Sequence, residues 1–206
     1  MTLFKKILKW TGIILLGLFI LAEIIRLPFR LQEEKTVAQV AKIHATKLTL
    51  DDVMGKNLPP DPGANADKTV QGIDANNNGI RDDVELVIFQ EYPNSAKTRA
   101  VLLQYALALQ METIQPIVNT ETVTEVVREQ SRAYACIGEI LTRDDNNKKI
   151  MDKYFKDGNN LRSFVKEKQL NTPERKKYRT DFLENIGSYN ESDNQVCDIN
   201  YSTLPN

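Results

Sequence analysis

Residues 96–115 read AKTRAVLLQYALALQMETIQ, and this stretch decides the expected fold. Two adjoining apolar stripes follow it at helical spacing, one of Val101, Leu102, Tyr105 and Leu109, the other of Leu103, Leu107, Met111 and Ile114. A helix that is apolar around so much of its circumference is typically buried among other helices. Pro116 cannot continue the hydrogen-bond ladder, so we expect the helix to end there. The stretch predicts a helical domain built around one central helix.

Further helices are expected on both sides of this central helix. Thr122 and Glu125 have the spacing of a capping box, which predicts the start of the next helix. Weaker helical patterns cover 147–155 and 160–169, and Thr172 is a suitable cap for a last helix. Few segments show the two-residue alternation of strands. The predicted fold class is therefore mostly α, with one soluble domain.

The N-terminus carries an uninterrupted apolar run, WTGIILLGLFILA, from Trp10 to Ala22. Counted from Ile7 to Ile25, the segment has the length that one helix needs to cross a bilayer. Trp10 lies where an interfacial aromatic residue is expected. We therefore expect residues 1–28 to be a membrane anchor and residues 29–206 to form the soluble domain.

The charges before the apolar run predict the orientation of this anchor. Lys5, Lys6 and Lys9 favour a cytoplasmic N-terminus, so the rest of the chain would lie in the periplasm of a bacterium, held by the inner membrane. The alternative is a signal peptide cleaved after Ala22, although bulky Ile20 at the minus-three position is unfavourable. No cysteine follows the apolar run, which excludes a bacterial lipoprotein. Under either interpretation the domain is exported.

The chain has two cysteines, Cys136 and Cys197. Disulfides persist in exported proteins, and a bridge here would close a loop worth about 4 kcal/mol in the chain-entropy model. It would join the C-terminal tail to a core helix. The alternative is two unrelated thiols; the spacing matches no zinc-ligand pattern.

Residues 74–85 read DANNNGIRDDVE and match the calcium-loop template D-x-[DN]-x-[DN]-G-x5-E at every specified position. Calcium prefers six to eight oxygen ligands in a flexible cage. The predicted ligands are the side chains of Asp74, Asn76, Asn78, Asp82 and Glu85 and the backbone carbonyl of Ile80. Gly79 permits the bend between the two halves of the loop. The alternative is an ordinary polar turn before a helix.

The loop resembles that of EF-hands and, more closely, the single calcium loops of bacterial surface proteins and thrombospondin type 3 repeats. It departs from the EF-hand because Arg81 replaces an apolar residue and because the proline-rich segment 59–72 cannot be an incoming helix. The resemblance implies one Ca²⁺ ion, held weakly in the range of about 0.1 to 1 mM, acting as a structural clip. The wider stretch LPPDPGANADKTVQGIDANNNGIRDDVE is similar to a segment of functionally uncharacterised Gram-negative envelope proteins, which implies a compartment and no activity.

Composition argues against two broad classes of function. The chain has 27 basic and 28 acidic residues, without the basic excess that nucleic-acid binding requires. The locally basic stretch 175–179 is flanked by acids, so we expect a solvated helix face there. His44 is the single histidine, and neither cysteine has a partner that would activate it. We therefore expect no enzyme.

Two kinds of function remain. The domain could be a binding module for a protein or a wall component, with calcium holding its shape; a membrane-anchored immunity protein that neutralises a toxin is one specific version. Alternatively, the chain could be a structural or assembly factor of the envelope that acts through its anchor.

Overall fold

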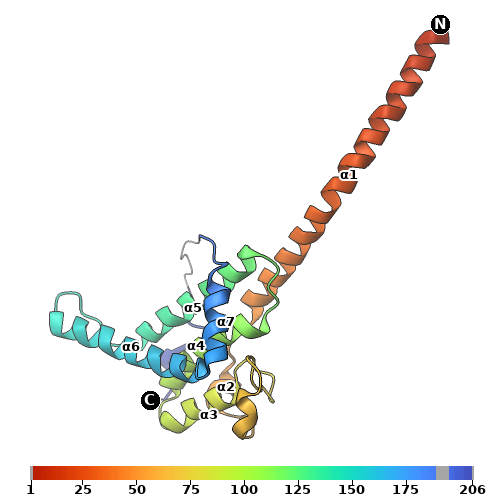
Figure 1. Cartoon of the computed structure of the whole chain (residues 1–206). Helices are drawn as coiled ribbons and strands as arrows, with labels where there is room; N and C mark the ends of the chain where they lie inside the picture. Colours follow the sequence, from red (N-terminus) through yellow and green to blue (C-terminus); the bar gives the residue numbers. More distant parts are fainter. Residues whose placement is uncertain (1, 189–194, 206) are drawn as a thin grey trace.

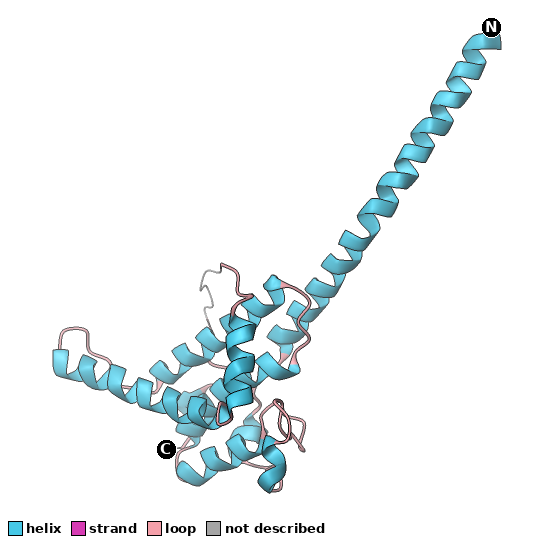
Figure 2. Ribbon diagram, viewed as in Figure 1, coloured by secondary structure: helices cyan, strands magenta, loops and turns pink. Residues whose placement is uncertain are grey.

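The computed structural model describes residues 2–188 and 195–205, and within these ranges it contains helices and no strand. The mostly α fold is thus confirmed (Figures 1 and 2). In chain order the elements are α1 (Thr2–Ala45), α2 (Leu50–Met54), the 3-10 helix η1 (Gly63–Asp67), α3 (Asp82–Glu91), α4 (Ala96–Ile114), α5 (Thr120–Glu139), α6 (Lys148–Gln169), α7 (Pro173–Leu183) and the 3-10 helix η2 (Tyr201–Thr203).

Helix α4 is the centre of the domain, as predicted. The α2, α3, α5 and α6 helices all pack against it, and both of its apolar stripes are buried except for Ile114 at the C-terminal end, which is exposed. The helix begins because the side chain of Ser95 accepts a hydrogen bond from the Thr98 N–H, and it ends at Gln115, directly before Pro116. Burial around the whole circumference explains why this one helix organises the others.

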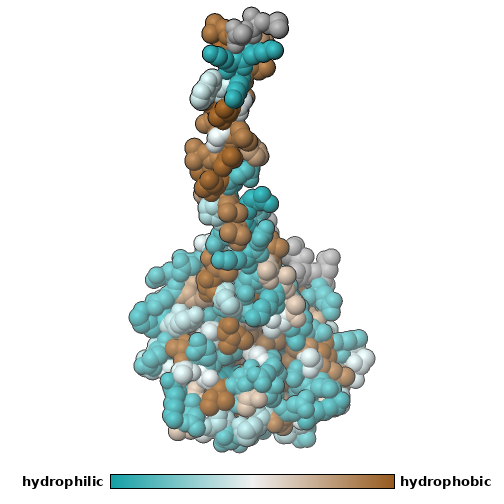
Figure 3. Space-filling model, turned by 90° about the vertical axis from the view of Figure 1, so that its right-hand side faces the viewer, coloured by the Kyte–Doolittle hydropathy of each residue, from teal (hydrophilic) through white to brown (hydrophobic). Residues whose placement is uncertain are grey.

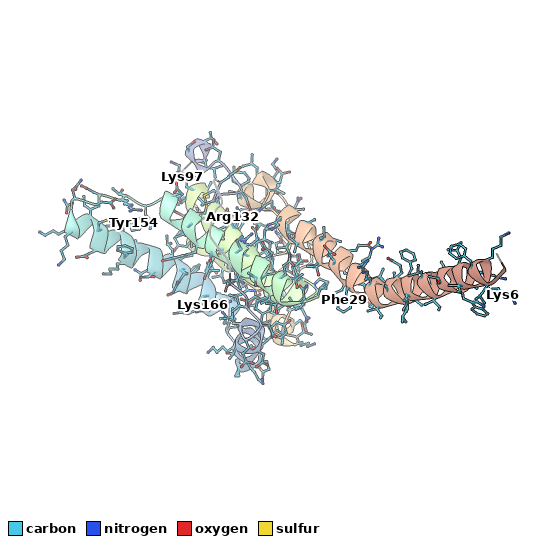
Figure 4. All side chains as sticks on the ribbon, turned by 90° about the horizontal axis from the view of Figure 1, so that it is seen from above. Lys6, Phe29, Lys97, Arg132, Tyr154 and Lys166 are labelled. Carbon is cyan, nitrogen blue, oxygen red and sulfur yellow. A yellow bond between two sulfur atoms is a disulfide. The ribbon has the colours of Figure 1, made fainter. Side chains whose placement is uncertain are left out.

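Helix α1 projects from the domain as a single helix of 44 residues. Its apolar side chains are exposed, and it is long and apolar enough to cross a membrane. Figure 3 shows brown apolar side chains along much of this projection, whereas the surface of the domain is mainly teal. The helix continues without a break through Pro28, where the sequence suggested the end of the anchor. Its axis changes direction near Phe29 (Figure 4), as is common after a proline inside a helix.

The last turns of α1 are built into the domain. They pack against α5, and Ile43 is fully buried. The side-chain amide of Gln39 donates to the Gln115 side chain over 2.9 Å, and that of Gln32 donates to the Val118 carbonyl over 3.1 Å. The projecting helix and the domain are therefore joined by side-chain contacts as well as by the chain.

Two predicted helix boundaries are wrong. The cap of α5 is Asn119 rather than Thr122, which occupies the third helical position and completes the capping box. The two weak helices expected at 147–155 and 160–169 are the single helix α6. The poor helix formers at 157–160 suggested a gap, but packing of α6 against α4 and α5 outweighs local propensity.

The basic stretch at 175–179 is only partly a solvated face. Arg175 is buried and donates to the carbonyls of Ala66, Thr69 and Val70, so it organises the proline-rich loop. Arg179 pairs with buried Glu112. These two side chains point inward because the loop and α4 offer acceptors that the sequence pattern does not reveal.

The predicted disulfide between Cys136 and Cys197 is present. It joins α5 to the C-terminal segment, which runs on to η2. Part of the polar tail expected after Ser188, residues 189–194 and 206, lies outside the described residues. The bond fixes the remaining tail against the core.

Candidate metal centre

The backbone of the loop Asp74–Glu85 has the shape that its glycine predicts. Gly79 has φ +83° and Asn77 has φ +57°, both in the left-handed region. A Cβ at Gly79 would lie 2.7 Å from Leu107 Cδ1, so a larger residue would collide with the core. The Asp82 N–H donates to the Ile73 carbonyl over 2.9 Å and closes the loop at the start of α3.

The first aspartate holds the turn together. Asp74 Oδ1 accepts from the Asn78 N–H over 3.1 Å, and its Oδ2 accepts from the Gly79 N–H over 2.9 Å. The Asn78 side-chain oxygen accepts from the Ile80 N–H over 2.9 Å. The Ile80 side chain is buried in the core. That the backbone carbonyl of Ile80 binds the ion stays a prediction.

The centre of the loop is the carboxylate of Glu85. Its Oε2 accepts from the side-chain amides of Asn76 and Asn78, each over 3.1 Å. Asn76 also donates to the Asn57 carbonyl over 2.9 Å, a contact that the sequence pattern did not predict. Three predicted ligands, at the third, fifth and twelfth loop positions, therefore meet at one point.

The loop acids are buried without a basic partner. Asp82 is 0% exposed and Glu85 is 1% exposed, and within the described residues neither carboxylate has a Lys, Arg or His side chain within ion-pair distance. Asp82 instead accepts from the Ala75 N–H over 3.0 Å. Buried charges normally require such a partner. Within the described ranges these two acids are therefore compensated by hydrogen bonds and not by a basic side chain.

Burial governs the ionisation of both acids. The pKa of Glu85 is raised to about 7, chiefly by burial; the charges of Asp52 and Asp82 act in the same direction, and the hydrogen bonds from Asn76 and Asn78 oppose them. Burial also raises the pKa of Asp82, as do the neighbouring acids Asp74 and Asp83. Both shifts have the sign expected of carboxylates that lack a cation.

Arg81 explains the main departure from the EF-hand pattern. Its side chain is fully buried, with Nη1 donating to the Gln169 carbonyl and Nη2 to the Lys168 carbonyl. Its Nε pairs with Asp83 at 2.5 Å, so Asp83 has a role beyond favourable charge at a helix N-terminus. Arg81 therefore joins the loop to the end of α6.

The donor set suits a hard cation only in part. Within 2–188 and 195–205, no three His, Cys, Asp or Glu side chains meet in an arrangement that could hold a metal, so a site would depend on the asparagine oxygens. Asn76 and Asn78 direct their amide nitrogens to Glu85, and cation binding requires each to present its oxygen instead. The carboxylates of Asp74 and Asp82 would likewise have to bind the ion through oxygens that already accept hydrogen bonds from backbone N–H groups. The residue types fit calcium, whereas the metal-free hydrogen bonds occupy the same oxygens.

A second charged cluster lies between α1, α5 and the C-terminal segment. His44 Nδ1 lies 2.9 Å from a Glu129 oxygen and its Nε2 lies 3.0 Å from a Glu125 oxygen. Both ring nitrogens face carboxylates, and only the doubly protonated imidazole can donate to both. His44 thus has a structural role, joining the last turn of α1 to α5.

Glu129 is the hub of this cluster. It also pairs with Lys47 at 3.0 Å and with Arg132 at 2.6 Å, and Arg132 in turn pairs with Asp198 at 2.8 Å. Burial alone would raise the pKa of Glu129, but hydrogen bonds from His44 and Arg132 and the neighbouring positive charges outweigh it and lower the pKa. The acids and bases compensate one another here, in contrast to the loop.

Comparison with models of protein families, with curated proteins and with solved structures finds no match to this chain. The argument for function therefore depends on the site itself.

Proposed function

We propose that this chain is a membrane-anchored periplasmic protein whose helical domain binds calcium in the loop Asp74–Glu85. The observation that carries the proposal is the pair of buried loop acids, Asp82 and Glu85, without a basic partner among the described residues. Calcium would supply the missing positive charge. The residues that would hold it are Asp74, Asn76, Asn78, the Ile80 carbonyl, Asp82 and Glu85.

The contacts of the loop favour a structural clip over a sensor. Asn76 reaches the segment after α2, Arg81 reaches the end of α6, and Glu85 belongs to α3. An ion held by the loop would therefore connect three elements of one domain. Of the proposed ligands, only Asp74, Asp82 and Glu85 have ionisable side chains. This low charge suits the weak affinities of about 0.1 to 1 mM found in extracellular calcium modules.

As the biological role we propose a binding module for a protein or a wall component, of which toxin neutralisation is one version. An open pocket of about 530 Å³ supports this role, lined by Ser163, Lys166, Glu167, Leu170, Asn171 and Lys176. Arg81 contacts the wall of this pocket, because its Nη2 lies 3.4 Å from Asn171 Oδ1. If calcium fixes the conformation of the loop, the contact of Arg81 with Asn171 would in turn hold the pocket wall in position.

The test is a calcium titration of the full chain in detergent, by calorimetry and by thermal melting, with Glu85→Gln as the variant. Glu91→Gln is the matched control, because Glu91 lies on the same helix and is exposed. At a hundred times its dissociation constant, calcium should stabilise the wild type and the control by about 2.7 kcal/mol. That corresponds to roughly 5 to 10 °C in melting temperature.

The Glu85→Gln variant should lose that stabilisation while it keeps its helical content. If calcium and chelator give the same melting temperature for the wild type, the metal proposal is wrong. If the variant and the control respond equally, calcium binds elsewhere.

The continuity of α1 with the domain favours a second candidate, an assembly factor of the envelope that acts through its anchor. Replacing residues 1–28 with a cleavable signal separates the two candidates. A binding module should retain its activity when released, whereas an assembly factor should lose it.

A further inference from the structure

The loop between α4 and α5, residues 115–119, is attached to the projecting helix α1. The Val118 carbonyl accepts from Gln32 over 3.1 Å, and the Asn119 side chain donates to the Thr36 hydroxyl over 2.9 Å. Gln32 and Thr36 lie one turn apart on α1. These contacts place the loop at a defined height along that helix.

The position on α1 that the loop contacts is close to the end of the apolar run. Gln32 follows Ile25 by seven residues, so the two are at most about 10 Å apart along the helix. The headgroup layer on each side of a bilayer is roughly 5 to 8 Å thick. When α1 spans a membrane and the hydrocarbon core ends at Ile25, the loop therefore lies at the outer edge of the headgroup layer.

The chemistry of the loop suits that layer. Its sequence, QPIVN, has no charged residue, and Ile117 leaves 43% of its surface exposed. The backbone N–H groups of Gln115, Val118 and Asn119 already donate within the protein, and Pro116 has none. Satisfied backbone groups reduce the cost of leaving water.

The neighbouring part of α1 has the same character. Phe29 is highly exposed, one turn before Gln32, and aromatic residues are enriched where a helix leaves the bilayer. Arg26 and Arg30 flank it, and guanidinium groups bind phosphate oxygens well. This part of α1 thus carries an exposed aromatic ring and two basic residues, followed by the acidic pair Glu33 and Glu34.

We propose that Phe29 rests in the headgroup layer of the membrane that α1 spans and that the loop 115–119 rests on its outer edge, so that the domain lies against the bilayer. The partner of this surface is lipid. The inference rests on the membrane anchor of the proposed function. With the loop at the membrane, α2 and α3 lie at the far end of the domain (Figure 1), where they face a soluble partner.

The experiment uses the full chain in liposomes, with an environment-sensitive fluorophore on Ile117→Cys. Met54→Cys is the matched control, because Met54 is an apolar residue on α2 that is 44% exposed. The native cysteines form the disulfide, so the label attaches to the introduced thiol. Trp10 is the single tryptophan, and its quenching by nitroxide-labelled lipids reports insertion of α1 in the same sample.

We expect nitroxide lipids to quench Trp10 and the label at position 117 and to leave the label at position 54 bright. The emission at position 117 should also shift to shorter wavelength when liposomes replace detergent-free buffer. Quenching of Trp10 without quenching at 117 would overturn this inference and leave the anchor standing. Equal quenching at 117 and 54 would also overturn it, because the domain would then lack the stated orientation. Absence of Trp10 quenching would overturn the anchor together with the inference.

Discussion

Gly79→Ala should destabilise the domain far more than the same change at Gly63, and the two sites form a matched pair. Both glycines have positive φ, +83° and +53°. Alanine at Gly63 would meet no atom within 4 Å, whereas at Gly79 its Cβ would lie 2.7 Å from Leu107 Cδ1. The comparison therefore separates backbone strain from collision with the core.

The expected loss of stability follows from these two contributions, the backbone strain and the collision with Leu107. Left-handed backbone costs a residue with a Cβ about 1 to 2 kcal/mol, and the smaller entropy of the unfolded alanine chain offsets about 0.4 to 1 kcal/mol. Gly63→Ala should thus cost about 1 kcal/mol or less. Leu107 is buried in the central helix and has little room to move, so overpacking at Gly79 adds about 1 to 3 kcal/mol.

The assay is thermal melting of the full chain, followed by circular dichroism, in chelator so that metal plays no part. A difference of about 2 kcal/mol between the variants corresponds to roughly 4 to 8 °C for a chain of this size. Equal melting temperatures for the two variants would refute the reasoning, because they would show that the loop does not press against Leu107 as described.

Other predictions concern the contacts that hold the domain together. Reducing the Cys136–Cys197 bond should lower stability by about 4 kcal/mol, measured as the shift in melting temperature with and without reductant. The pKa of Glu129 is lowered in the fold, so its contribution to stability is present above the ordinary value of 4.5 and is lost as pH falls below that value. Glu129→Gln should therefore reduce the fall in melting temperature on acidification below pH 4.5. An unchanged slope would contradict this expectation. Arg175→Met should lower the free energy of unfolding in urea by about 3 kcal/mol, because it leaves several loop carbonyls without a donor. The control Lys177→Met removes an exposed ion pair on the same helix and should lower it by less than about 1 kcal/mol.

The sequence alone determined the features that depend on local pattern. The two apolar stripes of 96–115 predicted a buried central helix. The length of the apolar N-terminal run predicted a helix able to cross a membrane. Two cysteines in a chain that the N-terminal pattern predicts to be exported led to the prediction of the disulfide, which is present. Each of these follows from residue types at fixed spacing.

Only the tertiary structure decided which charged groups are buried and what they contact. Arg81 and Arg175 follow a pattern typical of solvent-exposed residues, yet they are buried because backbone carbonyls of distant segments need donors. Helix α6 passes through the weak helix formers at 157–160 without a break, and the helix as a whole packs against α4 and α5. Of the ligands that the loop motif predicted, Asn76 and Asn78 contact Glu85, but the motif could not reveal that Asp74 and Asp82 are engaged with backbone N–H groups. Such contacts join residues far apart in the chain, and local spacing carries no information about them.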